Sequence, residues 1–272
     1  MRLTVDDKTS LKQFLALFQL LKKWSANITL KFEPTRLTIQ CMDKSHVCLA
    51  DISINSSWFK EYECQQETMI TVISTHLADI LTALSKEPKE KEKEKEKDSD
   101  KSLELVYDES INSDKLYLNS LSQSCERHFE LMLVECEDNA LTIPEVEYDV
   151  ELLISAKEIA AHLHDLQATG PNLTLKCEED FIHLKAEGDY SSMHVKLNTD
   201  ALEEYSITED YNSEIQFSLE HLCSMCLTTN ITNQVSIALS DEFPMRLKYH
   251  LGNENGISQG YIAFYLAPKI AD

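Results

Sequence analysis

Hydrophobic and polar residues alternate along this chain with two periods, one of two residues and one near 3.6. Alternating runs predict half-buried antiparallel strands, among them LTIQCMD (37–43), SHVCLADISI (45–54), FIHLKAEG (181–188) and SMHVKLNTD (192–200). Four stretches with the helical period each follow a short apolar strand and a serine that we expect to cap the helix: Ser10, Ser74, Ser155 and Ser218. Many strands with few short helices predict an α+β fold whose sheets carry helices on one face.

The same pattern occurs twice. NITLKFE begins at Asn27 and NLTLKCE at Asn172, 145 residues later, and five of the seven positions are identical. The helical stretches from Ser10 and Thr75 have counterparts at or within one residue of this offset, from Ser155 and Leu219. The sequence therefore predicts a tandem duplication in which each half contains two strand-helix-meander units.

Two segments interrupt the repeat. Residues 85–101 contain KEPKEKEKEKEKDSDK, which has nothing apolar to bury and predicts a solvated loop, an insertion of about 11 residues in the first half. Residues 134–147 (VECEDNALTIPEVE) lie between two strand patterns and predict an interdomain connector. We thus expect domains at 1–133 and 148–272, in agreement with the number of residues that two modest cores need.

Composition and charge exclude several classes of function. No apolar run approaches the roughly 20 residues of a membrane span, and the N-terminal MRLTVDDKTS lacks a signal core, so we expect a soluble protein made in the cytosol. The eight scattered cysteines are then reduced thiols. A net charge of −22 disfavours nucleic acid as a partner unless basic residues gather locally.

Motifs for catalysis are weak. GNENGISQG from Gly252 lacks the spacing of a phosphate-binding loop, and His162 and His164 would point to different helix faces. Cys223 and Cys226 form a single CxxC, for which two thiols packed on a helix are a simpler interpretation than a redox or zinc site. We expect no cofactor, no metal and no enzymatic activity; the enzyme hypothesis depends on these two cysteines alone.

Four segments resemble a known family. CMDKSHVCLADISI from Cys41, LTIPEVEYDV from Leu141, FPMRLKYHL from Phe243 and YLAPKIAD from Tyr265 are similar, in this order, to segments of eukaryotic sliding clamps of the proliferating cell nuclear antigen family. The resemblance implies the DNA-clamp fold, with helices on the inner face of a closed ring of three subunits and sheets outside. It also implies a processivity factor that encircles duplex DNA and tethers DNA polymerase, the clamp loader and repair proteins. Its location would be the nucleus, or a cytoplasmic replication site if the source is a virus.

Two surfaces follow from the resemblance. One is a pocket for partner peptides, which insert an aliphatic and two aromatic side chains as a short helical plug. The same residues could also be ordinary core positions at strand ends. The implied pocket residues are Met42, His46, Val47, Leu141, Ile143, Pro144, Tyr148, Pro244, Tyr265, Ala267 and Pro268. The other surface is a subunit interface between two strand edges, which plain internal strands would equally explain; its implied residues are Phe129, Leu131 and Leu133 against Met193, Val195 and Leu197.

The implied DNA-facing helices depart from the family. Positions that carry lysine or arginine in relatives are neutral or acidic here: Gln13, Gln19, Asp79, Thr82, Ala161 and His164. The basic residues that remain on or beside these helices are Lys8, Lys12, Lys22, Lys23 and Lys157. Fewer phosphate contacts predict weak direct DNA binding. An alternative is therefore a clamp-like adaptor that binds partner peptides without encircling DNA, or that does so only in a heterotrimer. The family's lysine for ubiquitin attachment is Glu179 here.

Overall fold

The structure is a computed structural model that describes residues 1–85, 102–122, 125–135, 141–226, 232–252 and 257–269. The charged segment 86–101 lies outside these residues. The first half of the chain contains β1 (Arg2–Val5), α1 (Lys8–Trp24), β2 (Asn27–Glu33), β3 (Arg36–Met42), β4 (Cys48–Asn55), η1 (Ser56–Trp58), β5 (Glu61–Glu63), β6 (Thr68–Ile73), α2 (Ser74–Ser85), β7 (Ser102–Val106), β8 (Lys115–Leu121) and β9 (Glu126–Met132). The second half contains β10 (Val150–Ser155), α3 (Ala156–Gln167), β11 (Asn172–Cys177), β12 (Phe181–Glu187), β13 (Ser192–Asn198), η3 (Thr199–Ala201), β14 (Glu204–Ile207), β15 (Glu214–Ser218), α4 (Leu219–Met225), β16 (Gln234–Leu239), β17 (Met245–Gly252) and β18 (Ser258–Leu266).

The duplication predicted from the sequence is confirmed strand by strand. β1 pairs with β5 and β7, and β10, its counterpart, pairs with β14 and β16. In the same way β2 lies between β3 and β6, and β11 lies between β12 and β15. All of these pairings are antiparallel, as the period-two patterns predicted. Both halves thus fold by one topology.

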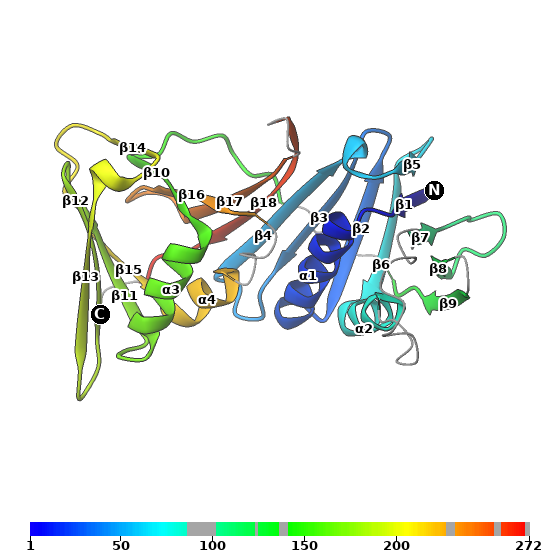
Figure 1. Cartoon of the computed structure of the whole chain (residues 1–272), viewed down its shortest axis with the longest axis horizontal. Coiled ribbons are helices and arrows are strands. Elements are labelled where there is room, and N and C mark those ends of the chain that lie inside the picture. Colours follow the sequence, from blue (N-terminus) through cyan, green and yellow to red (C-terminus); the bar gives the residue numbers. More distant parts are fainter. Residues whose placement is uncertain (86–101, 123–124, 136–140, 227–231, 253–256, 270–272) are drawn as a thin grey trace, which may run out of the picture. The chain divides into compact units, whose positions relative to one another are not determined.

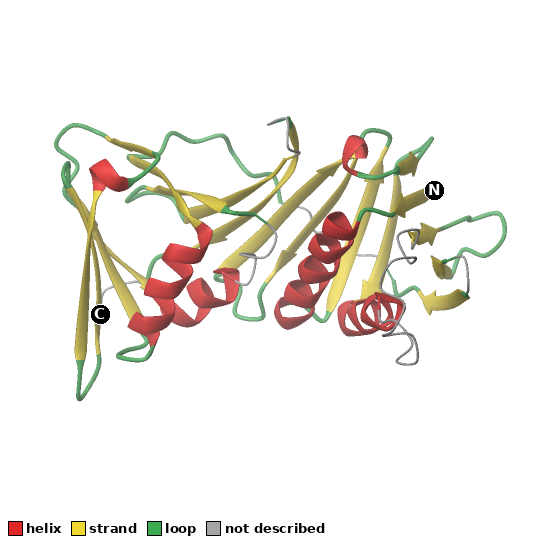
Figure 2. Ribbon diagram, in the orientation of Figure 1, coloured by secondary structure: helices red, strands yellow, loops and turns green. Residues whose placement is uncertain are grey.

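The chain forms two compact units, which are described separately. Unit 1 comprises Met1–Cys41, Ile52–Ala140 and Gly252–Gly260, and unit 2 comprises Met42–Asp51, Leu141–Leu251 and Tyr261–Asp272. Unit 1 contains the strand order β5-β1-β7-β8-β9 and a second layer β4-β3-β2-β6, to which β4 contributes its residues from Ile52 onward. Unit 2 contains β14-β10-β16-β17-β18-β4, to which β4 contributes its residues up to Asp51, and β13-β12-β11-β15. In each unit the two helices pack side by side on one face of the strands (Figures 1 and 2). The domain boundaries at 133 and 148 stay predictions.

One of the four predicted serine caps is present, and the other three helix starts differ from the prediction. Ser155 caps α3 by accepting the Glu158 N–H, as expected. For α1 the expectation was wrong, because the helix begins two residues before Ser10 and the Asp7 carboxylate accepts the Ser10 N–H at 2.7 Å. Ser74 instead donates its hydroxyl to the carbonyls of residues 25 and 26, and Ser218 makes no capping hydrogen bond. A preceding aspartate can take the place of a serine as cap, because the side chains of both residue types accept hydrogen bonds from the free N–H groups at a helix start.

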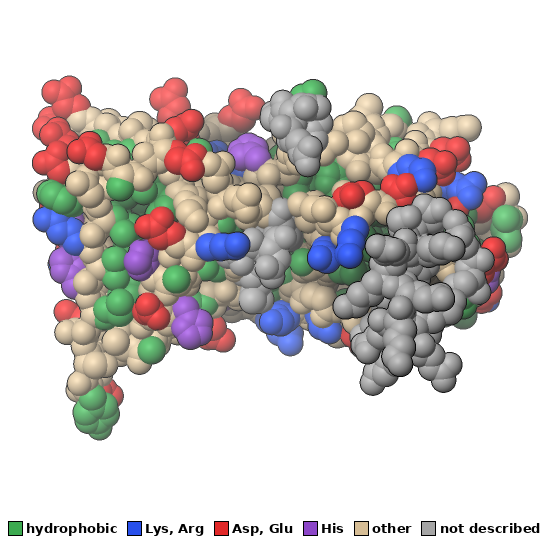
Figure 3. All heavy atoms as spheres, viewed as in Figure 1, with side chains coloured by type: hydrophobic (Ala, Val, Ile, Leu, Met, Phe, Trp, Pro, Cys, Tyr) green, Lys and Arg blue, Asp and Glu red, His purple; other side chains and the backbone are tan. Residues whose placement is uncertain are grey.

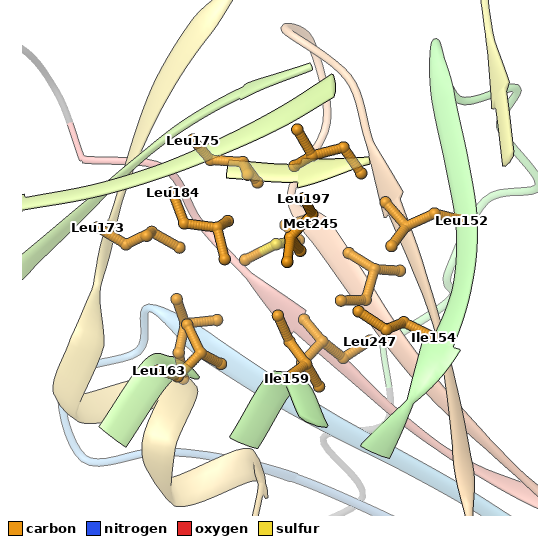
Figure 4. A pocket seen from close by; sticks show the side chains of 13 residues that line it. Leu152, Ile154, Ile159, Leu163, Leu173, Leu175, Leu184, Leu197, Met245 and Leu247 are labelled. Carbon is orange, nitrogen blue, oxygen red and sulfur yellow. The ribbon is translucent and has the colours of Figure 1, made fainter. Parts of the chain in front are cut away.

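Each unit has its own apolar core. In unit 1, α1 buries Phe14, Leu17 and Phe18 at helical spacing, and the Phe14 ring lies 4.8 Å from Phe18 and 6.0 Å from Trp58, between centroids. In unit 2 the core surrounds a cavity of about 30 Å³ that leucine, isoleucine and methionine side chains line (Figure 4). A cavity of this size with wholly apolar walls offers water no hydrogen-bond partners and is too small for an organic ligand. It is a packing feature rather than a binding site.

Gly260 in β18 is one position where only glycine fits. Its φ is +138°, and a Cβ there would lie 2.2 Å from the Ser53 carbonyl oxygen of the adjacent strand. The glycine therefore permits two backbones to approach closely. No helix in the described part of the chain is long and apolar enough to cross a membrane.

Candidate functional site

Residues 43–48, between β3 and β4, form a tight loop that one carboxylate organises. Asp43 Oδ1 accepts the backbone N–H groups of Val47 and Cys48 at 2.9 and 2.7 Å, and Oδ2 accepts the N–H and hydroxyl of Ser45. Burial opposes ionisation of Asp43, but the hydrogen bonds from Ser45 and Cys48, with His221 nearby, outweigh it and lower the pKa of Asp43 to about 2. One carboxylate that is ionised at neutral pH thus bonds several groups of the loop at once.

The same loop holds the segment that follows β18. The Val47 carbonyl accepts the N–H of Ala267 at 3.0 Å, and Lys269 further along donates its N–H to the Gln216 carbonyl at 2.8 Å. His46 adopts a left-handed φ of 58°, and its side chain and that of Val47 are exposed. The sequence-predicted pocket residues Val47 and Ala267 are therefore in direct contact.

A second group of predicted pocket residues gathers around Tyr148. Its hydroxyl donates to the Pro244 carbonyl at 3.4 Å, and the Arg246 guanidinium lies 4.7 Å from the centre of its ring. Burial raises the pKa of Tyr148 and of Tyr265, and each phenol therefore stays protonated and able to donate a hydrogen bond at neutral pH. Arg246 also bonds Glu151 at 2.9 Å, while its Nε is buried without a hydrogen-bond partner among the described residues.

The remaining predicted pocket residues also lie in unit 2. Leu141 and Pro144 are exposed on the segment that precedes β10, with Leu141 retaining 50% of its accessible surface, and Ile143 between them is half-buried. Met42 is half-buried at the end of β3, and Pro268 is exposed after β18. We call the eleven predicted residues the docking surface; all of them belong to unit 2.

On the helix-bearing face of unit 1, polar side chains connect the two helices. Lys22 on α1 forms an ion pair with Asp79 on α2, with 3.1 Å between Nζ and Oδ1. Gln19 donates its amide N–H to the Thr82 hydroxyl at 2.5 Å and to the Ala78 carbonyl at 3.2 Å. Three of the positions at which the sequence lacks the family's basic residues are thus engaged in helix-to-helix contacts.

The other predicted DNA-facing residues are solvent-accessible on α1 and α3. Lys8, Lys12 and Lys23 on α1 are exposed, as are Lys157 and His164 on α3. On the side shown in Figure 3, lysine and arginine side chains are scattered among acidic, histidine and uncharged ones in each unit. The described residues form no continuous basic surface on this face.

The two strands to which the predicted interface residues belong, β9 and β13, are both edge strands in the described part of the chain. β9 pairs with β8 and β13 pairs with β12, and each is the last strand of its sheet. The predicted interface side chains on these strands, and that of Leu133 directly after β9, are half-buried, except Leu131, which is 5% exposed in the core of unit 1. Leu197 lines the cavity of unit 2 (Figure 4). These side chains therefore belong to their own units, and the edges offer mainly backbone groups to a neighbour.

The thiols show no sign of activation. Burial raises the pKa of Cys226 and of Cys177 to about 12 and also raises that of Cys223, so none of the three forms a thiolate at neutral pH. None of the seven described cysteines forms a disulfide. The described residues contain no group of three or more histidine, cysteine or acidic side chains that could hold a metal ion.

Sequence reasoning missed three residues at these sites: Asp43 as the organiser of its loop, His221 as its partner from α4, and Arg246 against Tyr148. The sequence offers a signal only for Asp43, because an aspartate followed two residues later by serine is typical of an Asx turn. Contacts with His221 and Arg246 depend on the tertiary fold and have no local signal.

The element order, repeated in both halves with helices on one face of antiparallel sheets, defines the two-domain fold of a DNA clamp. In a comparison with solved structures, the chain superposes with a TM-score of 0.82 and 24% identity on a chain of the PCNA2–PCNA3 complex from Sulfolobus tokodaii, over 99% of both chains. A curated relative from Chaetomium thermophilum, a proliferating cell nuclear antigen, is 28% identical over 246 residues, which cover 87% of this chain and 86% of the relative.

Family models extend this likeness to both domains. The N-terminal domain of proliferating cell nuclear antigen matches residues 4–139, and the C-terminal domain matches residues 142–269. The chain belongs to the proliferating cell nuclear antigen family of sliding clamps. It is thereby a non-enzymatic scaffold of DNA replication, and the enzyme hypothesis on Cys223 and Cys226 is set aside.

Proposed function

We propose that three copies of this chain close into a ring around duplex DNA and tether DNA polymerase, the clamp loader and repair factors to their template. The membership of both halves in the sliding-clamp family carries this proposal. Tethering raises the effective concentration of a weakly bound enzyme at its template and so makes synthesis processive. The proposed location is the nucleus, or a cytoplasmic replication site for a viral protein.

The open strand edges support ring closure. Along an antiparallel edge strand, every second residue directs its backbone N–H and C=O groups to the neighbouring strand, and the residues between them direct these groups outward. Directly after β9 the Leu133 N–H bonds the Asp114 carbonyl, and directly after β13 the Thr199 N–H bonds the Asp180 carbonyl. The backbone groups of odd-numbered residues therefore face the neighbouring strand on both β9 and β13. The outward backbone groups are then those of His128 and Glu130 on β9 and of His194 and Lys196 on β13. A head-to-tail contact between these edges uses different surfaces on each copy and can close into a ring.

The docking surface supports recruitment of partners. It combines exposed apolar side chains such as Val47 and Leu141 with phenols that can donate hydrogen bonds. We propose that a partner inserts its aliphatic and aromatic side chains here, while its flanking chain pairs with the backbone that follows Ala267. The half-buried Met42 suits a pocket that must accept several partners, because a thioether side chain adapts its shape easily.

The mass of the protein in solution tests ring formation. Light scattering on a sizing column at several concentrations and salts should give three times the 31.1 kDa of one chain. A monomeric mass throughout would contradict self-assembly and favour either a missing partner subunit or the peptide-binding adaptor.

DNA topology separates the clamp from the adaptor. After loading with a clamp loader, a ring should remain on nicked circular DNA in high salt and should slide off the same DNA once it is linearised. Equal retention on both forms would contradict encirclement. The adaptor hypothesis has one observation in its favour, the ion pair of Lys22 with Asp79 on the face that would meet DNA.

A further inference from the structure

The Asp43 carboxylate has a partner from a distant part of the chain. His221, in the first turn of α4, places Nε2 3.4 Å from Asp43 Oδ2 and Nδ1 2.9 Å from the Ser218 hydroxyl oxygen. The two side chains are 24% and 12% exposed, so water screens this contact only partly. The helix that carries His221 thus contacts the loop that carries two residues of the docking surface.

The contact between His221 and Asp43 can affect the whole 43–48 loop. One carboxylate accepts bonds from three backbone N–H groups of the loop, at residues 45, 47 and 48. Any rotation of the Asp43 side chain would loosen these bonds together, and with them the left-handed turn at His46. It would also move the Val47 carbonyl that receives the Ala267 N–H. The orientation of one side chain therefore fixes the shape of this part of the docking surface.

We propose that His221 is a positioning residue for the docking surface, which holds the Asp43 carboxylate and the 43–48 loop in the peptide-receiving conformation, and holds them more firmly when its imidazole is protonated. This inference rests on the proposed docking function. A neutral imidazole can donate one N–H to Asp43, whereas the imidazolium adds opposite charge to the same hydrogen bond. A loop that is already ordered loses less entropy when a peptide binds.

The surroundings of His221 leave Asp43 as the charged group that it faces. Within its own helix it contacts the Ser218 hydroxyl, and Glu220 beside it is exposed. Lys44 and His46 of the loop are exposed. α3 and β15 also pack against α4, but no charged side chain from them lies within ion-pair distance of His221 among the described residues. Protonation of His221 should therefore act mainly through Asp43.

Hydrogen exchange in the free protein tests the positioning directly. We would measure deuterium exchange at the backbone amides of Val47 and Cys48 from about pH 8 to about pH 5.5, a range that spans the ordinary titration of histidine. After correction for the intrinsic rates, protection in the wild type should rise as the pH falls. In His221→Gln it should be about three- to tenfold lower at the acidic end and independent of pH. His164→Gln, which changes an exposed histidine on α3, is the matched control. Equal protection in His221→Gln and the wild type across the range would overturn the proposal.

Peptide binding provides the second readout. The probe is a short synthetic peptide with one aliphatic and two adjacent aromatic anchors and a fluorescent label, with its dissociation constant measured by anisotropy over the same pH range. The wild type should gain affinity towards acidic pH relative to His221→Gln, and Ser218→Ala, which frees Nδ1 without touching the loop, should show part of the loss. His46 is present in every variant, so any effect of its own on peptide binding is the same in each. Parallel pH profiles in all variants would therefore count against the proposal. A peptide that binds no variant would refute the docking function, and the exchange data would still decide the role of His221.

Discussion

The ion pair between Lys22 and Asp79 leads to a prediction about DNA binding. Lys22 lies on the helix face proposed to meet DNA, yet its ammonium group is 3.1 Å from an Asp79 carboxylate oxygen. Replacing Asp79 by asparagine preserves the shape of the side chain and removes the charge. The freed lysine should then contact phosphate, and DNA binding should become tighter and more dependent on salt.

The structure sets the size of the effect. Lys22 and Asp79 are 28% and 69% exposed, and the ion pair is therefore partly screened by water; its loss should lower the free energy of unfolding by about 0.5 kcal/mol or less. Each newly neutralised phosphate steepens the slope of log K against log salt by about 0.9. The slope for one ring should therefore steepen by about 0.9 if one subunit touches DNA at a time, and by about 2.7 if all three subunits do.

Fluorescence anisotropy with a labelled duplex, titrated at several salt concentrations, measures this slope. The matched control is Glu67→Gln, which removes the same charge from an ion pair of similar exposure that does not involve the helices. Its partner Lys31 keeps a second carboxylate, that of Glu33, at 3.5 Å. Asp79→Asn should steepen the slope and the control should not. An unchanged slope in Asp79→Asn would refute the idea that Asp79 suppresses DNA contact, and equal steepening in both variants would mean that only net charge matters.

Further predictions concern the edge, the loop and the core. Lys196→Pro deletes an outward amide of β13 and should reduce the solution mass from three chains to one, whereas Lys196→Ala should leave it unchanged. The pKa of Asp43 lies below its ordinary value, so the ionised carboxylate stabilises the folded protein fully above about pH 4, and this stabilisation is lost as the pH falls to about 2. Denaturant titrations of the wild type should show that the free energy of unfolding falls by about 2 kcal/mol over this range, a change that Asp43→Asn should lack. Leu163→Ala would enlarge the existing cavity and should lower the free energy of unfolding by about 3 kcal/mol, measured in the same way. Native Cys226 should react slowly with Ellman's reagent while exposed Cys125 reacts fast, and a fast Cys226 would contradict its burial.

Periodicity predicted the fold well because each strand and helix buries one side in the core and leaves the other side in contact with solvent. The runs from Asn27 and Asn172 are strands with the same pairing, and their repetition predicted the duplication. The details at the element ends were predicted less well. Ser10 and Asp7 both offer acceptors near the start of α1, and only the folded backbone decides that Asp7 makes the capping bond.

The candidate site depended more on resemblance than on local pattern. The docking surface combines segments far apart in the sequence, and the contact of Val47 with Ala267 spans nearly the whole chain. On the α1–α2 face, a count of charged residues in the sequence does not show which of them pair with each other. The sequence indicates only that position 79 lacks a cation, whereas the structure shows that Asp79 also neutralises a cation that remains, Lys22.

That neutralisation has a physical rationale in a ring that is held by topology. A helix pair that presents only lysines to the DNA repels itself whenever DNA is absent, and similar charges on facing helices destabilise their packing. Here Lys22 and Asp79 attract each other, and Gln19 adds two uncharged hydrogen bonds across the same helix pair. A closed ring does not need high affinity to stay on a duplex, because leaving requires either an end or an opening of the ring. We therefore expect the α1–α2 pair to favour stability of the free clamp over phosphate contacts, so that Asp79→Asn should improve DNA binding while it slightly weakens the fold.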